Sequence, residues 1–92
     1  MPEVRFTIRW PDGAEEVCYS PSTAIGRHLA AGARYPMPEF LARARAGLRE
    51  ASDRVEAKYG FACSSAMDQL ARIENRAASF PDGGPVDCLA LS

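Results

Sequence analysis

Two cysteines of this sequence each stand just before a serine-containing segment of the kind that starts a helix. Cys18 lies two residues before Ser20, and Cys63 directly precedes Ser64 and Ser65. The first turn of a helix leaves backbone N–H groups unpaired, which lower the pKa of a nearby thiol and attract anions. These five residues are therefore the candidate ligand-binding or thiol site. The alternative is that both cysteines are small buried apolar residues, since no histidine base stands near them in the sequence.

A metal site is the next chemistry that the residue types allow. The lone histidine, His28, together with Cys18, Cys63 and Cys88 has the ligand types of a Cys₃His zinc site. Their spacing lacks the paired short loops of structural zinc sites, so we predict neither a metal nor a cofactor. We expect His28 to be a partly exposed residue of a helix instead. Without a CxxC pair, the three cysteines are expected to be free thiols.

Other catalytic patterns are missing from the sequence. The carboxylates fall mostly on faces expected to be solvated, Ser64 is not part of a GxSxG turn, and no glycine-rich phosphate loop is present. Arg5 and Arg9 line the expected outer face of the first strand, where they can meet an acidic protein or a nucleic-acid backbone or simply form a polar sheet surface. We expect no catalysis by this chain, and a thiol enzyme remains the alternative.

Length and charge restrict the class of protein further. The 92 residues are enough for a single domain, residues 1–92, with one core. A net charge of −1 makes nucleic acid an unlikely partner, because phosphate binding usually requires a basic domain. No apolar run approaches the ~20 residues that span a bilayer, and the amino terminus has charges within its apolar pattern, so we expect a cytoplasmic protein that does not enter a membrane.

The amino-terminal part of the chain has the pattern of a β-hairpin. Apolar and polar residues alternate over 4–10, Pro11-Asp12-Gly13 is a turn, and the return strand covers 15–19. A bulge at the turn would decide whether Val17 and Tyr19 or Glu16 and Cys18 face the core, so both registers stay open. A short helix is expected next, capped by Ser20 and stopped by Gly32, followed by a connector over 33–37.

Two longer helices are expected in the second half. Apolar residues at steps of three and four predict a central helix over 38–59, ended by Gly60. Ser65 and Asp68 resemble a capping box for a further helix that ends near residue 78. After a turn at 80–85, residues 86–91 can form a third strand or an ordered tail. The predicted fold class is therefore α+β: a small antiparallel sheet packed on two main helices and one short helix, in the order β-β-α-α-α-β.

The runs WPDG, CYSPS and KYGFACSSA, together with YPMPEF, carry a resemblance to a known family. The chain resembles the bacterial nitrogen-starvation response proteins that are encoded in conserved gene clusters with a nitrilase. Those clusters also carry a radical S-adenosylmethionine enzyme, an acetyltransferase, a flavoprotein and a glycosyltransferase-like gene. The resemblance implies a role in nitrogen scavenging and supplies no molecular activity.

Three functions follow as alternatives. The first is a non-enzymatic accessory protein that binds an enzyme of its own gene cluster or associates with itself. The second is a small ligand- or metal-binding protein, or a thiol enzyme, that uses Cys18 and Cys63; it requires the two helix starts to meet in space. The third is a regulator that contacts nucleic acid through Arg5, Arg9 and the arginines of the central helix.

Overall fold

A computed structural model describes residues 3–61 and 64–92 of the chain, so the candidate residue Cys63 lies outside the described residues. Within these described residues, four strands, two α-helices and one 3₁₀ helix follow one another in the order β1, β2, η1, β3, α1, α2, β4. Their bounds are β1 Val4–Arg9, β2 Glu15–Ser20, η1 Thr23–Arg27, β3 Arg34–Pro36, α1 Met37–Tyr59, α2 Ser64–Ala77 and β4 Pro85–Leu91.

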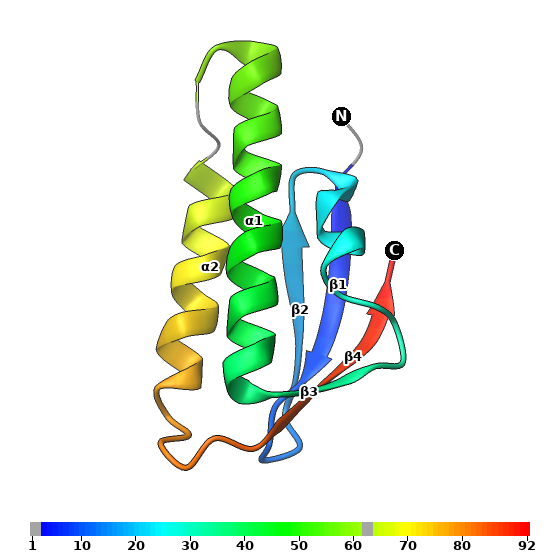
Figure 1. Ribbon diagram of the computed structural model, residues 1–92, viewed down its shortest axis with the longest axis vertical. Helices are drawn as coiled ribbons and strands as arrows, with labels where there is room; N and C mark the ends of the chain where they lie inside the picture. Colours follow the sequence, from blue (N-terminus) through cyan, green and yellow to red (C-terminus); the bar gives the residue numbers. More distant parts are fainter. Residues whose placement is uncertain (1–2, 62–63) are drawn as a thin grey trace.

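The strands form one antiparallel sheet in the order β2-β1-β4-β3, and the helices pack against one face of it (Figure 1). The α+β prediction is confirmed, including the pairing of the carboxy-terminal strand with the hairpin. β3 was missed, because the sequence analysis treated 33–37 as a connector. Three residues that end in Pro36 are too short to show a period of two, so the strand is visible only through its pairing with β4.

The hairpin has a register that settles which side of β2 faces the core. Phe6 pairs with Cys18, both are buried, and Ser20 is buried on the same side of β2. Val17 points to the opposite side and is 63% exposed. The sequence left two registers open, and the structure has the one in which Glu16 and Cys18 face the core. Gly13, at φ +90°, closes the turn, as its lack of a Cβ allows.

Helix α1 is the longest element and carries the predicted apolar stripe. Its buried residues include Phe40, Ala44, Leu48, Ala51 and Val55. Gly60, at φ +83°, ends the helix and donates its N–H to the carbonyl of Glu56, as predicted for a left-handed terminator. Tyr59, which the stripe also included, is 51% exposed, because it lies in the last turn beyond the reach of the sheet.

The start of η1 differs from the prediction. The 3₁₀ helix begins at Thr23 and its cap is Ser22, whose side chain accepts a hydrogen bond from the N–H of Ala24. Ser20, the predicted cap, remains in β2, and its hydroxyl donates to the carbonyl of Ser22 at 2.8 Å. The chain therefore turns two residues later than predicted, because a local serine–backbone turn precedes the helix.

Helix α2 begins two residues earlier than the predicted capping box allows, because a cap at Ser65 would make Ala66 the first helical residue. It starts at Ser64, so Ser65 lies within the first turn rather than before it. Its buried side consists of Ala66, Gln69, Leu70, Ile73 and Ala77. No helix within residues 3–61 and 64–92 is long and apolar enough to span a bilayer.

Candidate functional site

The first candidate residues, Cys18 and Ser20, lie in β2 with their side chains in the core. Cys18 is 1% exposed, and burial raises the pKa of its thiol to about 12, with a further contribution from the nearby Glu16 carboxylate. A thiol that stays protonated at neutral pH is a poor nucleophile and a poor metal ligand. The hydroxyl of Ser20 is fully buried and bonded to the backbone of Ser22.

The second pair of candidates lies in the first turn of α2. Ser64 and Ser65 are exposed there. Ser65 and Tyr19, the residue between Cys18 and Ser20, line one small pocket of about 210 Å³. The segments that follow the two cysteines in the sequence therefore do meet, although Cys18 itself points to the other side of β2. The remaining lining residues are Asp68, Gln69 and Arg72.

Gln69 links α2 to the outer edge of β2 and was not identified from the sequence. It is 8% exposed, and its Oε1 accepts a hydrogen bond from the backbone N–H of Tyr19 at 3.0 Å. Its Nε2 is buried without a hydrogen-bond partner among the described residues. Its place on the apolar stripe between Ala66 and Ile73 could have identified it, because a glutamine at a buried position needs a hydrogen-bond partner from another element.

His28 lies against α1, beside Gly47 and Glu50. Its Nε2 is 3.8 Å from Oε1 of Glu50, which is also paired with Arg27. The hydrogen bond from Arg27 lowers the pKa of Glu50 below its usual value, helped by the charges of Arg27, His28 and Arg54. Within the described ranges, no three side chains of the types His, Cys, Asp or Glu are grouped so that they could hold a metal ion.

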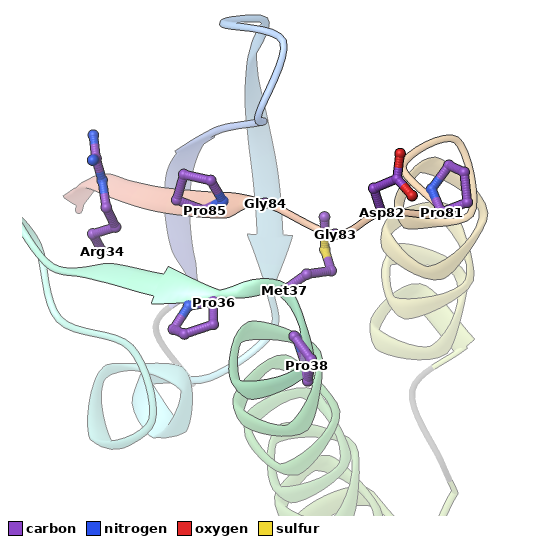
Figure 2. Close-up of a pocket in the computed structure, with 9 residues that line it drawn as sticks. All are labelled: Arg34, Pro36, Met37, Pro38, Pro81, Asp82, Gly83, Gly84 and Pro85. Atoms are coloured by element: carbon purple, nitrogen blue, oxygen red, sulfur yellow. The ribbon is translucent and has the colours of Figure 1, made fainter.

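A groove lies at the end of the molecule where α1 begins. It has two connected parts, of about 710 and 520 Å³, which share Met37, Pro38, Pro81 and Gly83. Figure 2 shows the first part, between β3, the start of α1 and the segment that leads into β4. The second part lies between α1 and α2 and adds the apolar residues Leu41, Ala77, Ala78 and Phe80.

Charged residues stand at the borders of this groove. Arg34 is bonded to Asp87 through Nε and Nη2, at 2.6 and 3.3 Å, and Arg45 is bonded to Glu74 at 2.9 Å. Asp82, at the opposite border from Arg34 in Figure 2, forms no ion pair with any described residue. The groove thus has an apolar floor and one carboxylate whose charge is not neutralised within residues 3–61 and 64–92.

Exposed apolar side chains gather at the opposite end, where α1 finishes and α2 starts. Tyr59 is 51%, Phe61 68% and Met67 37% exposed. The rings of Tyr59 and Phe61 have centroids 6.4 Å apart, and the ammonium group of Lys58 lies 5.5 Å from the Tyr59 ring centroid. We call Lys58, Tyr59 and Phe61 the aromatic tip; Met67 lies farther along, on α2.

The face of the sheet that the helices leave uncovered carries a row of alternating charges. Across β3, β4, β1 and β2, Arg34 is opposite Asp87, Asp87 is opposite Arg9, and Arg9 is opposite Glu15. Arg9 contacts Glu15 at 3.4 Å. Arg9 is thus neutralised by its neighbours, whereas Arg5 has Glu3 as its nearest carboxylate, at 3.9 Å.

The next row on this uncovered face has no charges. Val17, Thr7 and Ala90 lie side by side on β2, β1 and β4. The row after it contains Tyr19 and Arg5. We call these five residues the outer sheet surface. Arg5 was identifiable from the sequence. The exposure of Val17 was not, because the facing of β2 depends on the turn, and neither was the position of Ala90, because its register depends on a bulge in β4 opposite Thr7 and Ile8.

Comparison with known proteins gives one family match. No curated protein and no solved structure matches the chain. A family model described as "Nitrogen starvation-induced protein NitG" matches residues 5–91, which include every strand residue that lines the outer sheet surface and both ends of α1. Since the match covers nearly all of the 92 residues, the chain belongs to the NitG family of nitrogen starvation-induced proteins.

Proposed function

We propose that this protein is a cytoplasmic accessory protein of the nitrogen-starvation response, which binds an enzyme of its nitrilase-containing gene cluster and performs no catalysis itself. The family places the chain in the setting of nitrogen starvation. The observation that carries the proposal is the outer sheet surface, which no helix of the described chain covers (Figure 1).

The composition of the outer sheet surface suits a protein partner. Its central row, Val17, Thr7 and Ala90, is uncharged, and the Arg34–Asp87 and Arg9–Glu15 pairs border it on one side. Protein interfaces have a centre with few charged residues and a polar rim, and the outer sheet surface has the same arrangement. Arg5 adds a positive charge that its own chain neutralises only weakly, which favours a partner with an acidic surface.

The partner is expected to dock on the face of β2 rather than extend the sheet at its edge. In an antiparallel pair of strands, hydrogen-bonded residue pairs alternate with pairs that are not hydrogen-bonded to each other. The backbone N–H of Trp10 donates to the carbonyl of Ala14, which makes the Arg5–Tyr19 pair one of the second kind, so the N–H of Tyr19 points away from β1. Gln69 accepts that N–H and therefore blocks part of the free edge. A protected edge disfavours the addition of another strand and leaves the side chains of the face as the contact.

The test uses the purified cluster enzymes one at a time, the nitrilase first, with native mass spectrometry and calorimetric titration. The wild-type protein is expected to bind one of them, and Val17→Glu is expected to weaken that binding at least tenfold, because it buries an unpaired charge at the centre of the contact. Ala71→Glu, on the exposed side of α2, is the matched control and should bind like wild type. Binding to none of the enzymes, or equal binding by Val17→Glu, would contradict the proposal.

A second candidate function is small-ligand binding at the pocket between Tyr19 and Ser65. The meeting of these two segments supports it. Because Cys18 is buried with a raised pKa, a thiol role would require Cys63. Native mass spectrometry of protein from nitrogen-starved cells, prepared without chelators, tests this function: an added mass that disappears in both Cys63→Ser and Ser65→Ala supports it, and a bare chain eliminates it.

A further inference from the structure

The two ends of helix α1 are also the two ends of the molecule. At 1.5 Å per residue, the 23 residues of α1 extend about 34 Å, and the longest dimension of the molecule is 39 Å. Figure 1 shows the start and the end of α1 at opposite ends of the long axis; the groove borders the start, and the aromatic tip follows from the last turn. A single chain thus presents an apolar projection and an apolar hollow that face in opposite directions.

No side chain of residues 3–61 or 64–92 fills the groove. Met37, Leu41 and Phe80 line it together with prolines, and each part is large enough for an aromatic side chain. Four of its lining residues, Pro36, Pro38, Pro81 and Pro85, are exposed rings with fixed φ. A hollow bordered by rigid residues keeps its shape when empty, which lowers the entropy cost of filling it.

The aromatic tip has the matching properties. Phe61 is 68% exposed and Tyr59 51%, and such grouped aromatic exposure in a small protein marks a contact surface. Lys58 beside these rings is a cation with no carboxylate partner among the described residues. Asp82 at the groove is a carboxylate in the same situation.

We infer that the aromatic tip of one copy of this protein inserts into the groove of a second copy, with Lys58 facing Asp82. In this head-to-tail arrangement the carboxy-terminal end of one α1, which has a partial negative charge, approaches the positive amino-terminal end of the next α1. Since α2 runs antiparallel to α1, the positive amino-terminal end of α2 in the first copy likewise faces the negative carboxy-terminal end of α2 in the second. The apolar fit, the charge pair and the helix dipoles therefore favour the same orientation.

This contact joins two different surfaces, so each copy keeps one free groove and one free tip. Because the two surfaces lie at opposite ends of the long axis, this contact adds copies in a line rather than closing into a small ring, and it produces rows of increasing length. The end of the molecule measures about 23 × 18 Å, so the contact falls well short of the roughly 800 Å² per partner of a stable interface. The rows are accordingly weak, reversible and dependent on concentration.

Sedimentation velocity over rising protein concentration tests the inference with two variants. Tyr59→Ser/Phe61→Ser removes the tip, and Ala78→Arg places a cation in the groove, at an exposed position where the end of α2 tolerates positive charge. Each variant alone is expected to stay monomeric while the wild type grows beyond two chains. An equimolar mixture of the two is expected to form pairs and nothing larger, because only one intact tip and one intact groove remain per pair.

The controls separate this contact from others. Ala71→Arg, exposed on α2 outside the groove, and Val17→Glu, on the outer sheet surface, should associate like wild type. A wild type that stays monomeric at every concentration, a wild type that stops at two chains, or a mixture that does not pair would overturn the inference. The result is independent of the proposed enzyme partner, since Val17→Glu affects that binding alone and the tip variant affects self-association alone.

Discussion

The two faces of the sheet are built by the same strands and have opposite relations to the rest of the chain. Phe6, Ile8 and Trp10 point inward and are at most 2% exposed. Their neighbours Arg5, Thr7 and Arg9 point to the opposite side of β1, where Arg5 and Arg9 are exposed and Thr7 is half-buried. Packing therefore determines the inner residues, whereas the outer residues contribute little to folding and are free to serve recognition.

The largest effect is expected on the inner face. Trp10 is 2% exposed, stacks on Phe80, meets Phe40 edge-on, and donates its Nε1–H to Glu16 at 2.9 Å. Trp10→Ala leaves a cavity and an unpaired carboxylate, so it should reduce the free energy of unfolding by about 3–5 kcal/mol. Urea unfolding followed by circular dichroism measures this. A loss below 1 kcal/mol would mean that the inner face does not hold the fold.

The segment that leads into β4 should show the next effect. Gly84 has φ +116°, and an added Cβ would lie 2.9 Å from Cβ of Pro11. Gly84→Ala should therefore destabilise the protein by about 1–3 kcal/mol. Gly26→Ala is the matched control, since its φ is ordinary and nothing lies within 4 Å, and it should be neutral or slightly stabilising. Thermal unfolding of the two variants compares them, and equal melting temperatures would refute the assignment of strain to Gly84.

The inner-face thiols give a prediction about alkaline pH. Burial raises the pKa of Cys18 to about 12 and raises that of Cys88 as well. The thiols of the unfolded chain ionise near pH 9, whereas the buried ones stay protonated to higher pH. The free energy of unfolding is therefore unaffected by these thiols below pH 9 and falls as the pH rises from 9 toward 12. In a Cys63→Ser background, iodoacetamide at pH 8 should label Cys18 and Cys88 only through unfolding. Labelling as fast as that of a free peptide would show that these thiols are not sealed in the core.

Substitutions on the outer face should barely change stability. Val17→Glu and Ala90→Arg place charges where solvent already reaches, so each should alter the free energy of unfolding by about 0.5 kcal/mol or less. The same urea measurement as for Trp10→Ala applies. A loss of several kcal/mol in either variant would mean that the outer face is part of the fold and would remove the contrast between the two faces.

The charged row on the outer face should respond weakly to acid. The hydrogen bond from Arg34 lowers the pKa of Asp87, and the charges of Arg34 and Arg9 act in the same direction. This contribution to stability is present above the unfolded pKa of the carboxyl and is lost as the pH falls through its lowered folded pKa. Asp87→Asn should flatten the acid side of the stability curve slightly. An unchanged curve would show that the pair contributes nothing in solution.

Patterns of neighbouring residues were sufficient to predict most helices and strands, but not to predict which residues of different strands share a surface. The alternation over 4–10, the α1 stripe and Gly60 are visible in adjacent residues, because one element alone determines them. The facing of β2 depends on the turn, the register of Ala90 on a bulge, and β3 on its pairing with β4. These features arise between distant segments, which a single sequence does not specify.

The candidate site was predicted less well than the fold for the same reason. Cys18 stands before a helix start in the sequence, yet its place in β2 turns its thiol into the core. The groove combines the start of α1 with the end of α2 and the turn before β4, and the outer sheet surface combines three strands. Neither has a contiguous motif.

The most direct test of the outer sheet surface is a nuclear magnetic resonance titration of ¹⁵N-labelled protein with the cluster enzyme that it binds. We expect the amide signals of the outer sheet surface to shift or broaden first, while those of Ala71 and the exposed side of α2 persist; the surface residues are Arg5, Thr7, Val17, Tyr19 and Ala90. Perturbation confined to the groove or the aromatic tip, or no perturbation by any enzyme of the cluster, would contradict the claim that the uncovered face of the sheet is the recognition surface.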